Sequence, residues 1–390
     1  MGVMRPSTSV TLGLFVSSLA FFPGPSSTFD QDSGGVRTET IDSLAQMIHT
    51  FVQNGWIVGA EFLVIHRGEV LRHEGFGWRD SETEVPLEVG TIFNIRSMTK
   101  PLVGAIVQRL ADAEVLDLDD PVSRFLPGFA EGESAKITIR HLLTQTSGLP
   151  DGNPAGRPSD YPTLRSIADY WGAHGPTISS PGVGFEYSDP GADVLGAVLE
   201  VATGLSLDSL AQREVFQPLG MVDAFALIGR EGSSDPRFCS LYQPSDGGNW
   251  RRIWKPGDGS ISPFTIGSGT TWYTTPGDYA RFVSAWLANG MVGDGRWLSE
   301  AAVERALEPG PVMSYANQIP STEVHYGQMW QVYVDPDDAG ESRVVAFGHS
   351  GSDGTYAWAW PNQGLVILYF TQSRGQRTRL LLEQRFGELF

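Results

Sequence analysis

Ser97 and Lys100 are the pair of residues in this chain whose types and spacing most plainly suggest chemistry. They lie in residues 94–100 (NIRSMTK), which an apolar run at 101–110 follows. Apolar side chains recur in that run at helical spacing: Leu102, Val103, Ile106, Val107 and Leu110. A helix that begins near Ser97 places the serine hydroxyl and the lysine amine on one face, one turn apart.

This arrangement suits nucleophilic catalysis. Serine is a weak nucleophile until a neighbouring group takes its proton. A lysine half-buried at a helix start can have its pKa lowered enough to help, and free N–H groups at that helix end favour a developing oxyanion. Ser-x-x-Lys alone is a weak signal, since a capping serine followed by an exposed lysine gives the same pattern.

Two further motifs strengthen the catalytic interpretation. Residues 185–189 (FEYSD) precede a predicted helix, and residues 347–352 (FGHSGS) end a predicted strand. Tyr187, with an ordinary phenol pKa of about 10, can act as a base at neutral pH only if a cation such as Lys100 stabilises its phenolate. A core aromatic is the plain alternative for Tyr187, but the order of the three motifs makes coincidence a poor explanation.

The elements that must position these residues can be predicted from the sequence patterns. These patterns indicate strands near both ends of the chain and helices between them. Strands are expected at 60–66, 69–73, 343–347, 356–360 and 365–371, and helices at 41–52, 139–143, 191–202, 207–216, 275–289 and 380–390. We therefore expect an α+β fold, with one mostly antiparallel sheet built from both ends of the chain and flanked by helices. Residues 116–264 are expected to form an inserted all-α subdomain, with the site at the seam.

Composition limits the classes of function. The chain has 390 residues, 41% of them hydrophobic and 18% charged, which suits one large domain or two interleaved ones. A formal net charge of −18 argues against nucleic acid or an anionic membrane as a partner. Cys239 is the only cysteine, so an intrachain disulfide or a cysteine zinc cluster is impossible, and no histidine pair has metal-ligand spacing.

The first 34 residues have the pattern of a signal peptide and leader. Arg5 precedes an uncharged, mostly apolar stretch at 10–22, and small residues follow at Gly24 and Ser26. We expect export of the protein, with residues 35–390 as the catalytic domain. No later stretch is long and apolar enough to cross a bilayer.

Together, these motifs resemble those of the serine β-lactamase, penicillin-binding protein and esterase superfamily, specifically its class C-like branch of peptidases and esterases. The likeness spans roughly residues 40–385 and also includes 141–150 (HLLTQTSGLP), 216–221 (FQPLGM) and 267–269 (GSG). The resemblance implies no cofactor and no metal. It implies hydrolysis of a small ester, amide or short peptide through an acyl-enzyme, by a carboxylesterase or D-amino-acid peptidase. A true β-lactamase and a non-hydrolysing penicillin-binding or sensor domain are the alternatives. The sequence leaves the oligomeric state open.

The resemblance also implies a role for each matching residue. Ser97 corresponds to the acylated nucleophile, Lys100 takes or relays its proton, and Tyr187 acts with Lys100 as the general base. The backbone N–H groups of Ser97 and Ser352 correspond to the oxyanion hole. The substrate-binding positions are Asp189, His349 and Gly351.

Two residues depart from the pattern of this superfamily. Most relatives carry asparagine where this chain has Asp189, and an ionised carboxylate can accept but not donate a hydrogen bond. Near Lys100, the charge of Asp189 would favour the protonated amine. Many relatives carry lysine where this chain has His349, and a neutral histidine attracts the carboxylate of a β-lactam less strongly.

Two other hypotheses concern Ser350 and the tryptophans of residues 242–272. Ser350 could be a lipase-type nucleophile, but that motif needs glycine at 352 and a helix directly afterwards. Trp250, Trp254 and Trp272 could form an aromatic lid over the acyl pocket, or could instead hold a long loop to the body.

Overall fold

The computed structural model describes residues 36–226, 235–258, 272–313, 319, 321–336, 342–375 and 377–386. The expected signal peptide and leader at 1–34 lie outside the described residues, as does the Gly267–Gly269 stretch.

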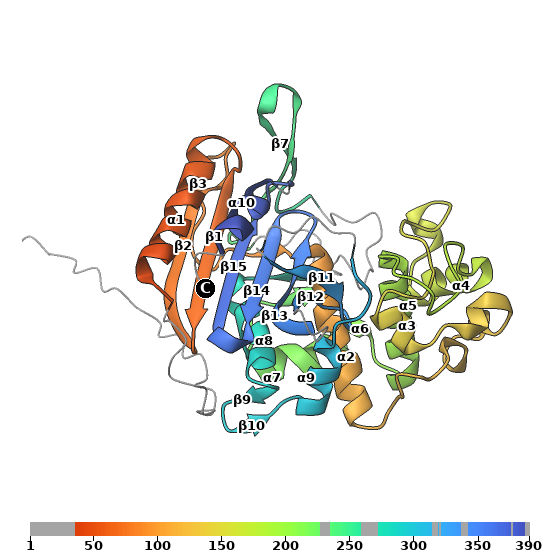
Figure 1. Cartoon of the computed structure of the whole chain (residues 1–390). Coiled ribbons are helices and arrows are strands. Elements are labelled where there is room, and N and C mark those ends of the chain that lie inside the picture. Colours follow the sequence, from red (N-terminus) through yellow and green to blue (C-terminus); the bar gives the residue numbers. More distant parts are fainter. Residues whose placement is uncertain are drawn as a thin grey trace, which may run out of the picture.

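An eight-stranded antiparallel sheet forms the centre of the molecule (Figure 1), in the order β11-β12-β13-β14-β15-β1-β2-β3. Its strands are β1 (Gly59–His66), β2 (Glu69–Asp80), β3 (Val85–Pro86), β11 (Glu323–Tyr326), β12 (Gln331–Pro336), β13 (Ser342–Gly351), β14 (Thr355–Trp360) and β15 (Leu365–Thr371). β1 pairs with β15 from Ala60 opposite Thr371 to His66 opposite Leu365. This pairing confirms that both ends of the chain build one sheet.

The central strands are apolar on both faces because each face carries its own core. Leu63 and Ile65 of β1 lie in one buried cluster, and Phe62 and Val64 lie in the other, as the two-residue period of a strand requires. The first cluster packs against α2 (Thr99–Asp112), α8 (Pro276–Leu287) and α9 (Glu300–Leu307). The second packs against the terminal helices α1 (Thr38–Gln53) and α10 (Arg377–Phe386). The fold is therefore α+β, with helices on both sides of the sheet.

A group of helices stands to one side of the sheet (Figure 1). It contains α3 (Ile139–Leu143), α4 (Leu164–His174) and α5 (Asp189–Thr203). Along the chain, α6 (Leu207–Ala211), the π-helical turn η6 (Gln212–Phe216) and α7 (Gln217–Leu219) follow and lead back to the body, where α7 contacts α8. α3 has the expected bounds, and α5 lies within two residues of its expected bounds. The helix expected at 207–216 is divided into α6 and the π-helical turn, and α4 was not predicted. Thr138 caps α3, Ser188 caps α5, and Gly204 ends α5 in the left-handed conformation.

Residues 225–254 differ from the expected all-α segment. They form β5 (Phe225–Ala226) and the hairpin of β6 (Leu241–Pro244) with β7 (Trp250–Trp254), while β5 joins β4 (Phe93–Asn94) and β8 (Trp272–Thr274) in a small sheet. A last hairpin pairs β9 (Met291–Val292) with β10 (Gly295–Arg296). Aromatic side chains from separate segments pack on one another here, including Phe225, Phe238, Trp254 and Tyr273. Contacts of this kind join residues that are far apart in the sequence, so they leave no local spacing from which these strands could be predicted. The division of 35–390 into subdomains stays a prediction.

The tryptophans of the lid hypothesis hold the chain to the body. Trp254 and Trp272 are both buried in hydrophobic clusters. The indole of Trp250 donates a hydrogen bond to the carbonyl of Gly55 (2.9 Å). Among the described residues, these contacts favour a pinned loop over a lid.

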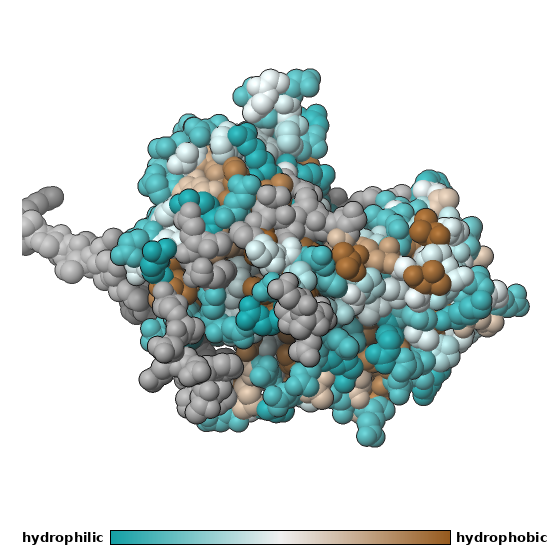
Figure 2. All heavy atoms as spheres, viewed as in Figure 1, coloured by the Kyte–Doolittle hydropathy of each residue, from teal (hydrophilic) through white to brown (hydrophobic). Residues whose placement is uncertain are grey.

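The visible surface is largely hydrophilic, with apolar residues scattered over it (Figure 2). In the described ranges, no single helix is long and apolar enough to span a membrane, although the bent pair Asp189–Thr203 and Leu207–Leu219 passes that test on length and composition taken together.

The packing of α2 against the sheet gives a first testable prediction. Ile106 is completely buried on this helix, so Ile106→Ala should lower the free energy of unfolding by about 2–5 kcal/mol through lost burial and a cavity. Val115→Ala, at a site 41% exposed just beyond the helix, should change it by less than about 0.5 kcal/mol. Urea denaturation measures both values, and equal losses would contradict the position of α2 in the core.

Candidate active site

Ser97 lies in a sharp turn between β4 and α2. This turn is the 3₁₀ segment η1 (Arg96–Met98), and the Ser97 side chain is half-buried. Arg96 has a φ of +47°, in the left-handed region that residues other than glycine rarely adopt. Its N–H donates to Asn94 Oδ1 at 3.0 Å, which stabilises the bend from within. The turn therefore presents the serine at the start of a fully packed helix, close to where the sequence predicts it.

A buried carboxylate holds this bend from the outside. Asp353 is completely buried and accepts a hydrogen bond from Arg96 Nε at 2.5 Å. Its other oxygen accepts from Arg374 Nη2 at 2.6 Å. Such charge-assisted bonds are stronger than neutral ones, so the β13–β14 turn holds the residue directly before Ser97 in its strained conformation. The sequence analysis missed Asp353. The signal that could have found it is an acidic residue directly after one motif, 347–352, and an arginine directly before Ser97 in the other.

The end of β13 lies directly beside the Ser97 turn. A Cβ atom on Gly351 would be 2.4 Å from the Ile95 carbonyl oxygen and 2.3 Å from Thr355 Oγ1, so only glycine allows this approach. Ser352 follows as an exposed residue. The structure thus brings residues 351–352 next to the nucleophile turn, as an oxyanion hole made by Ser97 and Ser352 requires. Their roles in that hole stay a prediction.

Lys100 is completely buried and contacts both Ser97 and Asp189. Its Nζ lies 3.4 Å from Ser97 Oγ and forms an ion pair with Asp189 Oδ1. Burial alone would lower the pKa of Lys100, but the Asp189 carboxylate and the Tyr187 phenol hold that pKa above its ordinary value. The expectation of a lysine with a lowered pKa is therefore wrong, because a carboxylate from α5 compensates the burial. The expected effect of Asp189, which is to favour the ammonium form, is confirmed.

Tyr187 completes a three-residue cluster. Lys100 Nζ lies 4.7 Å from the centre of the Tyr187 ring, and the side chains of Lys100 and Ser97 both act to lower the pKa of the phenol. Burial raises the pKa of Tyr187, the Lys100 charge opposes this rise, and the Asp189 charge adds to it. At rest the phenol is therefore neutral and the lysine is charged. The structure brings together the three residues that the sequence singled out.

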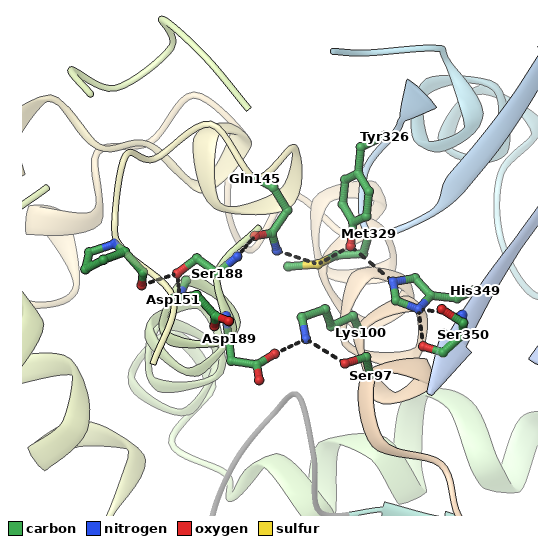
Figure 3. Close-up of polar contacts among 12 residues, drawn as sticks. Ser97, Lys100, Gln145, Asp151, Ser188, Asp189, Tyr326, Met329, His349 and Ser350 are labelled. Atoms are coloured by element: carbon green, nitrogen blue, oxygen red, sulfur yellow. Dashed lines mark hydrogen bonds and ion pairs between the residues drawn. The ribbon is translucent and has the colours of Figure 1, made fainter. Parts of the chain in front are cut away.

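His349 of β13 lies beside this cluster (Figure 3). It is buried, its Nε2 lies 3.3 Å from the Tyr326 hydroxyl, and its Nδ1 accepts the N–H of Ser350 at 2.9 Å. Burial and then the Lys100 charge lower the pKa of His349 to about 3. The imidazole is thus neutral at pH 7, as expected. Tyr326 gave no signal in the sequence, because only the pairing of β11 and β12 places it here.

The charges around the site balance one another. The Asp189 side chain is 39% exposed while its partner Lys100 is not exposed at all, so within this ion pair the carboxylate is the group that faces solvent. Arg96 and Arg374 both bond Asp353, away from the lysine. Within the described ranges, no three His, Cys, Asp or Glu side chains are arranged to hold a metal ion.

The lipase interpretation of Ser350 is wrong. β13 ends at Gly351 and a short turn leads directly into β14, with Ser350 paired opposite Tyr356. The helix that a nucleophile elbow needs after its serine is therefore replaced by a strand.

Comparisons with known proteins agree with this geometry. A family model described as Beta-lactamase matches residues 44–386. Esterase EstB of Burkholderia gladioli is 37% identical in an alignment of 206 residues that covers 46% of this chain and 52% of the esterase, about half its length. An uncharacterized protein of Mycobacterium tuberculosis is 27% identical over 364 residues, covering 85% of this chain and 90% of that protein.

Solved structures show the same fold. EstCE1, described as a hydrolase with promiscuous acyltransferase activity, aligns with a TM-score of 0.74 at 21% identity, over 90% of this chain and 99% of that chain. The family match runs from within α1 to the last residue of α10, so it includes both ends of the sheet and all three residues of the cluster. This protein belongs to the beta-lactamase family.

Proposed function

We propose that this protein is a serine hydrolase that cleaves small esters or amides through an acyl-enzyme on Ser97, with neutral carboxylic esters as its preferred substrates. The observation that carries the proposal is the convergence of Ser97, Lys100 and Tyr187 at a turn flanked by the end of β13. An esterase among the similar proteins supports the same reaction class.

The geometry suggests how the reaction proceeds. In the reactive form Tyr187 has lost its proton to solvent, and the Lys100 ammonium stabilises the resulting phenolate. This phenolate takes the proton of Ser97 Oγ as that oxygen attacks the substrate carbonyl. The N–H groups of Ser97 and Ser352 stabilise the oxyanion. The leaving alcohol or amine then takes the proton from Tyr187. Water next attacks the acyl group while Tyr187 takes its proton, and Ser97 Oγ leaves with that proton.

The charge balance favours neutral esters over β-lactams. A β-lactam antibiotic carries a carboxylate, but Lys100 is paired with Asp189 and His349 is neutral. A substrate with a free amine, such as a short D-amino-acid peptide, is the second candidate, because the part-exposed Asp189 carboxylate attracts a cation.

A non-hydrolysing sensor stays the alternative, and it would release one equivalent of product from p-nitrophenyl acetate and then stop.

We also propose that residues 1–34 direct export of the protein. The support is the sequence pattern alone, namely Arg5, the apolar stretch at 10–22 and the small residues after it. N-terminal sequencing of the secreted or periplasmic protein tests this proposal, and an intact leader on a cytoplasmic protein would contradict it.

Removing the nucleophile tests the reaction. Ser97→Ala should lower kcat for p-nitrophenyl esters by about 1,000-fold or more and abolish labelling by a fluorophosphonate, because no acyl-enzyme can form. Ser350→Ala is the matched control, since it removes the neighbouring serine of the rejected lipase motif and should still be labelled. Labelling of Ser97→Ala, or its loss in Ser350→Ala, would overturn the assignment.

Replacing the partner of Lys100 tests the proposed base. Because Tyr187 must lose its proton to act, kcat/KM should rise with pH, and the Asp189 charge moves that rise upward by raising the pKa of Tyr187. Asp189→Asn should therefore shift the rising limb to lower pH.

Asp246→Asn, on the exposed β6–β7 turn, makes the same charge change away from the site and should leave the profile in place. An Asp189→Asn variant that is inactive at every pH would instead assign the base to Asp189.

Substrate choice provides a separate test. A charge-assisted hydrogen bond contributes about 1.5–3 kcal/mol, so a site in which Lys100 is already paired and His349 is neutral should bind a β-lactam carboxylate about 10- to 100-fold more weakly than a site with an unpaired cation at these positions. We expect sustained turnover of p-nitrophenyl acetate and butyrate, and little turnover of nitrocefin. Faster hydrolysis of nitrocefin than of the esters in parallel assays would contradict the preference for neutral esters.

A further inference from the structure

The loop that carries Tyr187 lies along residues 145–148, which connect α3 to the rest of the helical group. The N–H of Gly182 donates to Thr146 O at 2.8 Å, and those of Thr177 and Ile178 donate to Gly148 O at 3.2 Å. These contacts are made by the backbone and do not depend on side-chain type. They fix the early part of the loop, some residues before the catalytic phenol.

Gln145 bonds this loop nearer to Tyr187 than these contacts do, through its backbone oxygen and its side chain. Its backbone oxygen accepts the N–H of Glu186 at 2.8 Å, and its Oε1 accepts the N–H of Ser188 at 2.6 Å. The residues on both sides of Tyr187 are thus tied to a single residue. Gln145 is buried and has a φ of +57°, so its own backbone is held in a left-handed conformation.

The other end of the Gln145 side chain reaches the opposite side of the site (Figure 3). Its Nε2 lies 3.8 Å from Met329 Sδ, and the Met329 N–H donates to Leu143 O at 2.9 Å. The Tyr326 hydroxyl lies 3.9 Å from the same sulfur and 3.3 Å from His349 Nε2. A continuous chain of contacts therefore runs from the Tyr187 loop to β13.

We propose that Gln145 is a positioning residue that holds the Tyr187 phenol within reach of both Ser97 and Lys100. The inference rests on the proposed function and names the residue that aligns its base. Peptide groups on both sides of Tyr187 determine where its Cα lies and where the ring points. Catalysis is sensitive to such placement, since a displacement of about 1 Å can cost about 100-fold in rate.

Two substitutions at Gln145 separate its acceptor oxygen from its bulk. Gln145→Met keeps the length and apolar contacts but cannot accept the Ser188 N–H, whereas Gln145→Glu keeps an oxygen acceptor at that place. Both keep the same backbone strain. Gln145→Met should lower kcat by about 100-fold with little change in KM, because Gln145 is expected not to touch substrate. Gln145→Glu should restore at least a tenth of wild-type kcat.

The pH profile separates positioning from simple loss of stability. A phenol that moves away from Lys100 loses the charge that opposes the rise of its pKa, so the rising limb of kcat/KM in Gln145→Met should shift to higher pH. Gln108→Met is the matched control. Gln108 is also completely buried and bonds Gln328 and Arg305 at the far end of α2. That variant should lose stability in urea but keep the wild-type pH profile.

Each outcome identifies which proposal fails. The positioning role is overturned if the wild-type protein turns over esters but Gln145→Met changes kcat and the pH profile no more than Gln108→Met does. The same holds if Gln145→Glu is as impaired as Gln145→Met while both remain folded by circular dichroism. If the wild-type protein is neither active nor labelled by a fluorophosphonate, the proposed function itself is overturned.

Discussion

The completely buried ammonium of Lys100 is the constraint on which the rest of the site depends. A charge removed from water is costly unless a partner and hydrogen bonds compensate it, and Asp189 at the start of α5 supplies that partner. This pair joins the helix behind Ser97 to the helical group beside the sheet. It also sets the resting protonation state, with a charged lysine and a neutral Tyr187. The lysine is therefore better suited to stabilise a phenolate than to remove a proton itself.

The nucleophile turn is held by elements distant in sequence. Arg96 keeps a left-handed backbone directly before Ser97, and Asp353 from the β13–β14 turn bonds its side chain. Gly351 lets the end of β13 lie against the same turn. Strain at a catalytic position persists only when its surroundings impose it. Here the sheet imposes it, so the serine and the strand edge that would form the oxyanion hole are positioned together.

The site of this chain differs in charge from the pattern of the superfamily it resembles. A carboxylate at 189 and a neutral imidazole at 349 replace the usual amide and ammonium, and the Asp189 carboxylate is partly exposed. Fold alone does not determine substrate. The pairing of these charges is therefore the physical basis for favouring neutral esters, with amine-bearing substrates second.

The sequence by itself determined the features that depend on near neighbours. The apolar spacing of residues 101–110 and the β-rich runs at 343–347, 356–360 and 365–371 predicted the helix and the strands that carry much of the site, and the motifs around Ser97 and Tyr187 predicted the cluster. Only the tertiary structure decided the direction of the Lys100 pKa, because its partner lies 89 residues away. The strands within 225–254 and the contacts of Gln145 were also decided there. Burial and long-range pairing depend on the whole fold, and no local spacing encodes them.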